Sequence, residues 1–208
     1  MKDMLEKLRE FPPKRILIII AIASTITTIA LFLEMRRIDA LLMRSGYGIV
    51  DFELAFKQEK VVEIFTDWGS SLMELAQKSI IIDFGFILSY VFCFSSLTLL
   101  LTKIIKGKLQ FLGLMVSILP FIAGFLDIIE NLSLLNLIVI FEVLNTSHPW
   151  CPRTPRGFDI IYFPYEDTYH YISLAGICAS LKFLLLGIVF LFIVLGGGYA
   201  LFRKFKSI

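Results

Sequence analysis

Residues 111–141 read FLGLMVSILPFIAGFLDIIENLSLLNLIVIF, a hydrophobic run that contains Asp127, Glu130 and Asn131. Positions three and four apart share one face of a helix, so two carboxyls and an amide point the same way here. An ionisable group near the centre of a membrane helix costs at least about 2.5 to 3.5 kcal/mol, and such groups therefore face a bundle interior or a wet cavity. The run predicts a membrane-crossing helix whose polar face meets polar side chains on other helices.

The composition of the whole chain is typical of an integral membrane protein. Of its 208 residues 57% are hydrophobic, and the mean hydropathy is +0.81. Runs that reach the roughly 20 residues needed to cross a hydrocarbon core of about 30 Å cover residues 15–34, 80–102, 111–141 and 171–202. We predict an all-α polytopic membrane protein, a single domain over residues 1–208. It would be a four-transmembrane-helix bundle with a helical extracytoplasmic cap, and its outer connections would be residues 35–79 and 142–170.

The basic residues indicate the orientation in the membrane. The formal net charge is only +2, and basic residues gather at segment ends rather than on one patch, which argues against a nucleic-acid partner. They are dense in the amino tail, the short second connection and the carboxyl tail, and sparse in the two long connections. The positive-inside rule then predicts a cell-membrane protein with both termini in the cytoplasm, although Arg36 and Arg37 close to the first helix oppose it. The dense groups include Lys103, Lys106, Lys108, Arg203, Lys204 and Lys206.

The first long connection is predicted to be folded. The first helix is expected to continue to about Leu42, where Gly46-Tyr47-Gly48 breaks it. A second helix, from about Lys57, has an apolar face that ends at Trp68, and Gly69 interrupts it. This pattern is typical of an interfacial helix, with Trp68 at the level of the lipid headgroups.

Polar residues in three crossings predict one shared site toward the outer side. Asp83 lies about one turn inside the second crossing, at a height comparable with that of the acids in the third. Lys182 lies deep in the fourth crossing, where a carboxylate is its expected partner. The predicted binding pocket comprises Asp83, Tyr90, Asp127, Glu130, Asn131 and Lys182.

Two interpretations of these groups remain open. A buried and mutually paired polar core would fix the register of the helices. Alternatively, three acids facing one lysine leave surplus negative charge, which favours a functional site with a bound cation or proton. If the protein is an enzyme, Asp127 or Glu130 would transfer the proton, with Asp83 as electrostatic partner and Lys182 as fixed positive charge. No motif assigns a cofactor.

Smaller features carry local predictions. Pro120 is expected to kink the third crossing because its ring removes a backbone hydrogen bond. Gly124 should permit a close approach by a neighbouring helix, and Asn136 is expected to hold helices together. Residues 196–198, three glycines, indicate either helix termination or close packing.

Two groups of polar residues have alternative interpretations. The hydroxyls of Ser24, Thr25, Thr27 and Thr28 could bond to their own helix backbone or line a cavity floor. His148, Cys151 and His170 could in principle bind zinc, but their spacing matches no strong template, and we predict no metal site.

Short motifs within about residues 48–186 carry a resemblance. They are GIVDFELAF at 48–56, WG at 68–69, DFGF at 83–86, DIIEN at 127–131 and SLKF at 180–183. In these motifs, and in Tyr90, the chain resembles a group of small four-helix prokaryotic integral membrane proteins of no assigned activity. The four-helix layout is also similar in outline to the sterol-isomerase and sigma-2-receptor group, which uses membrane carboxylates on a lipid-like ligand.

Three classes of function follow from these predictions. The first is a membrane protein whose polar intramembrane pocket, in its outer half, binds or modifies a lipid or other amphiphile. The second is a small oligomeric transporter, channel or accessory subunit in which the buried acids and lysine form an ion or proton path. The third is a structural or assembly protein with a paired polar core. The expected partners are membrane lipid and, for the second class, further copies of the chain.

Overall fold

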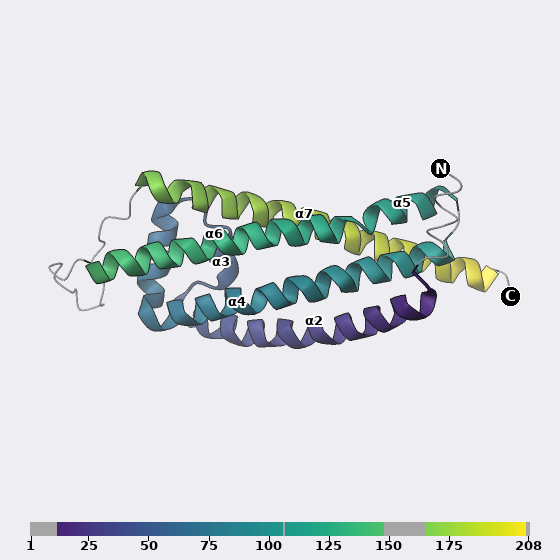
Figure 1. Cartoon of the computed structure of the whole chain (residues 1–208), viewed down its shortest axis with the longest axis horizontal. Coiled ribbons are helices and arrows are strands. Elements are labelled where there is room, and N and C mark those ends of the chain that lie inside the picture. Colours follow the sequence, from purple (N-terminus) through teal and green to yellow (C-terminus); the bar gives the residue numbers. More distant parts are fainter. Residues whose placement is uncertain (1–11, 106, 148–164, 207–208) are drawn as a thin grey trace. The chain divides into compact units, whose positions relative to one another are not determined.

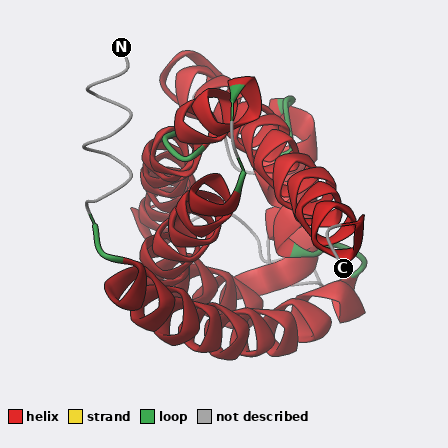
Figure 2. Ribbon diagram, turned by 90° about the vertical axis from the view of Figure 1, so that its right-hand side faces the viewer, coloured by secondary structure: helices red, strands yellow, loops and turns green. Residues whose placement is uncertain are grey.

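The computed structural model of the protein describes residues 12–105, 107–147 and 165–206. Every regular element within these ranges is a helix (Figure 2), so the all-α prediction is confirmed for the described part of the chain. The elements labelled in Figure 1, together with the short 3-10 helix η1, are α2 (Lys14–Leu42), η1 (Met43–Ser45), α3 (Ile49–Glu53), α4 (Gln58–Ile104), α5 (Lys108–Val116), α6 (Leu119–Ser147) and α7 (Tyr165–Lys206).

Four stretches of the described chain are long and apolar enough to cross a membrane. They are Lys14–Ser45, Gln58–Ile104, Lys108–Val143 and Thr168–Ala200, in the order that the sequence predicts. Many of their apolar side chains face outward: only 11% of the most apolar window of the first stretch is buried. Monomeric soluble proteins rarely expose such continuous apolar faces. These helices are therefore compatible with a multi-pass membrane protein.

The described residues form two compact units, and α2, α4, α6 and α7 each contribute to both. Unit 1 contains residues 12–30, 86–105, 107–125 and 182–206. Unit 2 contains residues 31–85, 126–147 and 165–181.

Unit 2 is built around a cluster of aromatic rings. The ring centroid of Phe65 lies 5.0 Å from that of Phe52 and 4.8 Å from that of Phe141. Trp68 is 2% exposed, and its indole nitrogen donates a hydrogen bond of 2.9 Å to the backbone oxygen of Tyr47. Trp68 packs edge-on against Phe52 of α3 at a centroid distance of 5.6 Å, so its ring contacts the protein core, and its position at headgroup level stays a prediction.

Local signals place the helix boundaries of unit 2 correctly. Gly46 adopts a left-handed conformation (φ 109°) and caps η1, directly after the predicted end near Leu42. α4 begins at Gln58, one residue after the predicted start. Gly69, at φ 58° and ψ −177°, interrupts α4 as predicted, because glycine adopts positive φ without a steric penalty. α4 therefore comprises a shorter segment before Gly69 and a long apolar segment after it.

In unit 1 the third long apolar stretch is broken rather than merely kinked. α5 ends at Val116 and α6 begins at Leu119, so Pro120 occupies the first turn of α6, where a missing N–H is tolerated. The Ser95 hydroxyl of α4 donates a hydrogen bond of 3.0 Å to the backbone oxygen of Ser117, which the break leaves outside the helical ladder. The prediction of a distortion at Pro120 is confirmed, and a side chain from α4 stabilises it.

Glycines provide close packing in unit 1. A Cβ atom added to Gly124 would lie 2.6 Å from the Cγ2 atom of Val91, so the predicted close approach is confirmed. A Cβ atom on Gly196 would lie 2.7 Å from the Cδ2 atom of Leu101, whereas Gly197 and Gly198 have no such neighbour. α7 continues to Lys206, so the glycines do not terminate the helix.

The hydroxyls of Ser24, Thr27 and Thr28 bond to the backbone of α2, whereas that of Thr25 lies 3.2 Å from the Cys93 sulfur of α4. Ser24 donates to the backbone oxygen of Ile20 at 2.6 Å, and Thr28 donates to that of Ser24 at 2.7 Å. Thr28 also donates to the Ser89 hydroxyl of α4 at 3.0 Å. These contacts support backbone bonding and helix packing over a cavity floor.

Candidate functional site

The buried face of α6 carries the acids that the sequence analysis singled out. Asp127, Glu130 and Asn131 are 2%, 0% and 2% exposed, whereas Ile128 and Leu132 on other faces are 38% and 51% exposed. The apolar side chains of this helix face outward and its carboxyls face inward. This is the arrangement expected where the surroundings of the helix are apolar.

One direct contact joins this face to α4. The Asn131 amide nitrogen donates a hydrogen bond of 2.7 Å to the Asp83 carboxyl oxygen, across 48 residues of sequence. Asp83 is 8% exposed, so the bond is buried. A typical intramolecular hydrogen bond stabilises a fold by about 0.5 to 1.5 kcal/mol. The contact fixes the register of α4 against α6 within unit 2.

A further buried hydroxyl lies beside this contact in the sequence of α4. Ser79 is one helical turn before Asp83 and is 1% exposed. Its hydroxyl oxygen forms no hydrogen bond with the described residues, whereas the Ser133 hydroxyl of α6 donates to the backbone oxygen of Ile129 at 2.9 Å. The sequence analysis missed Ser79, although its four-residue spacing from Asp83 was a usable signal. Ser79 retains the capacity to bind a small polar group.

Tyr90 and Lys182, the two other predicted pocket residues, belong to unit 1. Tyr90 is 2% exposed, and its ring packs against Phe86 and Phe94 with centroid distances of 5.5 and 6.3 Å. Lys182 is 5% exposed, and its amino nitrogen lies 5.1 Å from the ring centroid of Phe183. The polar core of unit 2, as we use the term below, therefore consists of Asp83, Asp127, Glu130 and Asn131.

Asn136 differs from its expected role. It is an exposed residue of α6, and its amide nitrogen donates a hydrogen bond of 2.9 Å to the backbone oxygen of Leu132 in the same helix. The expectation that it holds helices together is wrong, because the helical turn places it on the outward face that Leu132 shares.

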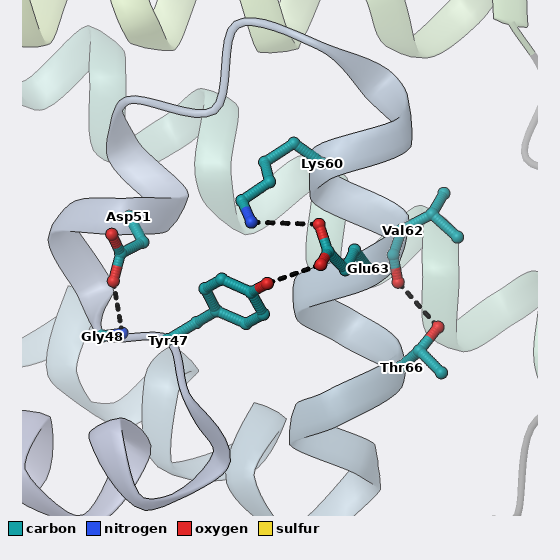
Figure 3. A network of polar contacts seen from close by, with 7 residues as sticks. All are labelled: Tyr47, Gly48, Asp51, Lys60, Val62, Glu63 and Thr66. Carbon is teal, nitrogen blue, oxygen red and sulfur yellow. Dashed lines mark hydrogen bonds and ion pairs between the residues drawn. The ribbon is translucent and has the colours of Figure 1, made fainter.

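A second polar network, drawn in Figure 3, ties the first connection to α4. The Tyr47 hydroxyl donates to one carboxylate oxygen of Glu63 at 2.5 Å, and the Lys60 amino group donates to the other at 2.9 Å. The Lys60 nitrogen also lies 3.8 Å from the ring centroid of Tyr47. The hydrogen bond from Tyr47 lowers the pKa of Glu63, and Tyr47 followed by Glu63 raises the pKa of Lys60. Lys60 and Glu63 belong to the short segment of α4 before Gly69, not to the long apolar segment after it, and their contacts are solvent-exposed. We therefore interpret the network as a surface contact that holds the connection between α2 and α4 in place.

Unit 1 contains a cleft of about 390 Å³ between α5, α7 and Ile105, the residue directly after α4. Its walls are almost entirely apolar and include Leu112, Val116, Ile188, Leu195 and Tyr199. None of the six predicted pocket residues lines it. This cleft was not foreseen from the sequence, because its walls come from runs that read only as membrane-crossing helices.

The polar core can accept hydrogen bonds and attract positive charge. Its three carboxyls and one amide lie on buried helix faces, where the electrostatic effect of a charge is strongest. Among the described residues no cluster of three or more His, Cys, Asp or Glu side chains could hold a metal ion, and His148 and Cys151 lie outside those residues. Comparison of the chain with protein families, curated proteins and solved structures gave no match.

Proposed function

We propose that this protein is an integral membrane protein whose polar core in unit 2 binds the polar group of a lipid or other amphiphile. Its four apolar stretches would cross the cell membrane with both termini in the cytoplasm. The residues between α2 and Gly69 would then form a helical cap on the opposite side. The outward apolar faces of α2 and α6 support the membrane location.

The observation that carries the proposal is the buried Asp83–Asn131 hydrogen bond with Asp127 and Glu130 on the same face of α6. Ionisable groups within membrane helices are costly, and they mark ligand sites or ion paths more often than they serve packing alone. The Ser79 hydroxyl adds a buried polar atom with bonding capacity, one turn from Asp83. A polar or cationic headgroup would complement this set of acceptors.

A structural role is the second candidate, and the Asn131–Asp83 hydrogen bond favours it specifically. A paired polar core fixes helix register without binding any ligand. In that case removal of the Asn131 amide would lower stability by about 1 to 3 kcal/mol and would leave the content of bound amphiphile unchanged.

The two candidates are separated by measuring bound amphiphile and stability on the same variants. The full chain is purified in a mild detergent, and co-purified amphiphile is quantified by native mass spectrometry and by extraction. Glu130→Gln keeps the shape of the side chain and replaces the ionisable carboxyl by an amide, and Glu142→Gln on the same helix is the matched control. If the polar core binds a ligand, Glu130→Gln should lower the amount of bound amphiphile at least about tenfold, which is equivalent to about 1.4 kcal/mol of binding free energy. Glu142→Gln should retain the wild-type amount.

Asn131→Ala completes the comparison, with Asn136→Ala as control because Asn136 is exposed on the same helix. If Asn131→Ala and Glu130→Gln both lower the unfolding midpoint while the amphiphile content stays that of the wild type, the structural role is correct. Wild-type protein without any stoichiometric amphiphile would also refute ligand binding.

A further inference from the structure

The short helix α3 and the loop after it expose three large apolar side chains, those of Val50, Leu54 and Phe56, which we call the α3 face. We propose that this face inserts into the headgroup layer of the bilayer and is the part of the cap that contacts lipid. The inference rests on the membrane location in the proposed function, but it does not depend on ligand binding by the polar core.

The core of unit 2 holds the α3 face in one orientation. Phe52 and Ala55 belong to that core and are 1% and 4% exposed. By contrast, Val50, Leu54 and Phe56 are 47%, 39% and 49% exposed. The backbone N–H of Leu54 donates a hydrogen bond of 3.0 Å to the backbone oxygen of Val50, so these two side chains lie one helical turn apart on the same side.

The first segment of α4, residues 58–68, exposes no comparable apolar surface. Its apolar side chains pack inside unit 2, where Val61, Ile64 and Phe65 are 1%, 0% and 0% exposed. Its exposed residues include Asp67. From residue 45 to residue 80 the exposed large apolar side chains are those of the α3 face. Lipid contact by this part of the cap therefore falls to that face.

A contact with α7 fixes where the α3 face lies along that helix. A Cβ atom added to Gly176 would lie 2.5 Å from the Cε1 atom of Phe56, so the ring lies directly against the backbone of α7. The apolar stretch of α7 ends at Ala200, before Arg203. The roughly 20 residues that cross a hydrocarbon core, counted back from Ala200, end at Leu181. Gly176 then lies about 8 Å beyond that core, at about 1.5 Å per residue.

An independent count along α2 gives nearly the same distance. Its apolar residues begin at Ile16, after Arg15, and roughly 20 residues from there end at Met35. Asp39 lies about 6 Å further along the helix. One carboxylate oxygen of Asp39 accepts a hydrogen bond of 2.9 Å from the backbone N–H of Ile49, the first residue of α3. Both counts therefore put α3 about 6 to 8 Å outside the hydrocarbon core.

This distance and the composition of the segment both fit the headgroup layer. That layer is about 5 to 8 Å thick on each side of the hydrocarbon core, and interfacial segments combine apolar side chains that enter it with charged side chains that face water. Asp51 and Lys57 are exposed beside the α3 face. Ile177, which follows Gly176, is 52% exposed, so an outward apolar side chain of α7 lies next to the residue that the Phe56 ring covers. Lipid that surrounds α7 would thus meet the α3 face as well.

A spin label on a single cysteine tests whether the α3 face lies in lipid. The full chain with Cys151→Ser and Leu54→Cys is labelled with a nitroxide and placed in vesicles of phosphatidylcholine with a minority of phosphatidylglycerol. Collisions with oxygen, which concentrates in lipid, and with a water-soluble nickel chelate are then measured. Cys93 and Cys178 are buried, and Cys151→Ser alone reports any labelling of them. The matched control is Asp67→Cys, an exposed position on the first segment of α4.

We expect the ratio of oxygen to nickel collisions at position 54 to exceed that at position 67 at least about threefold. Equal ratios at the two positions would overturn the proposal. A label at position 54 that neither agent reaches would also overturn it, because protein would then cover the face. If circular dichroism shows that Leu54→Cys does not fold, Val50→Cys on the same side of α3 decides by the same criteria.

Ile26→Cys separates this inference from the membrane location on which it rests. Ile26 is 64% exposed near the middle of the apolar stretch of α2, so oxygen should reach its label and the nickel chelate should not. If that holds while the label at position 54 lies in water, the inference fails and the membrane location stands. If the label at position 26 lies in water, both fail. Glu130→Gln, which tests the polar core, should leave the ratio at position 54 unchanged.

Discussion

Gly124→Ala tests the tightest part of the packing between α4 and α6 in unit 1. The added Cβ atom would lie 2.6 Å from the Cγ2 atom of Val91 and 3.2 Å from that of Ile87. Non-bonded carbon atoms prefer about 3.5 to 4.0 Å, so the first contact is too short by about 1 Å. Valine is stiff about χ1, and Val91 cannot relieve the overlap without leaving its preferred rotamer. The two helices must therefore move apart.

The expected cost follows from two opposing terms. Overpacking of an interior costs about 1 to 3 kcal/mol, whereas replacement of glycine by alanine within a helix stabilises it by roughly 0.5 to 1 kcal/mol. We expect a net loss of about 0.5 to 2 kcal/mol for Gly124→Ala. Gly187→Ala on α7 is the matched control: its Cβ atom meets nothing within 4 Å, so only the stabilising term applies.

The assay is unfolding by graded addition of sodium dodecyl sulfate to protein in mild detergent, followed by the circular dichroism of the helices. A double variant that adds Val91→Ala removes the clashing atom and should be more stable than the sum of the single changes by about 0.5 kcal/mol or more. The packing argument would be refuted if Gly124→Ala were as stable as Gly187→Ala, or if the double variant were merely additive.

Three further substitutions test contacts outside that interface. Tyr47→Phe removes the main cause of the lowered pKa of Glu63, so carbon NMR should show that pKa rising toward 4.5. Because the pKa of Glu63 is lowered in the folded state, the contact with Tyr47 stabilises the connection at higher pH. This stabilisation is lost as the pH falls through the folded-state pKa. Trp68→Phe keeps the aromatic ring but removes the indole N–H, which should cost about 0.5 to 1.5 kcal/mol in the same unfolding assay. Ser95→Ala removes the donor to the Ser117 carbonyl and should cost about 1 kcal/mol, and an unchanged midpoint would show that this carbonyl finds another partner.

The helix boundaries were predictable because their causes are local. Glycine at Gly46 and Gly69 permits positive φ, and Pro120 lacks an N–H wherever the chain places it. The inward orientation of Asp127 and Glu130 was also predictable, since positions three apart share one helix face and ionisable groups in an apolar helix avoid lipid. These conclusions need only the backbone and the spacing of neighbouring residues.

The pairing of distant faces was decided by the tertiary structure. The sequence by itself determined that the chain is helical, that four stretches can cross a membrane, and that the acids of α6 lie on one buried face. Only the tertiary structure decided that Asn131 contacts Asp83, that Trp68 enters a protein core, and that α5 and α7 enclose an apolar cleft. The reason is that helical periodicity specifies which face is buried, whereas its partner depends on contacts between residues far apart in the chain.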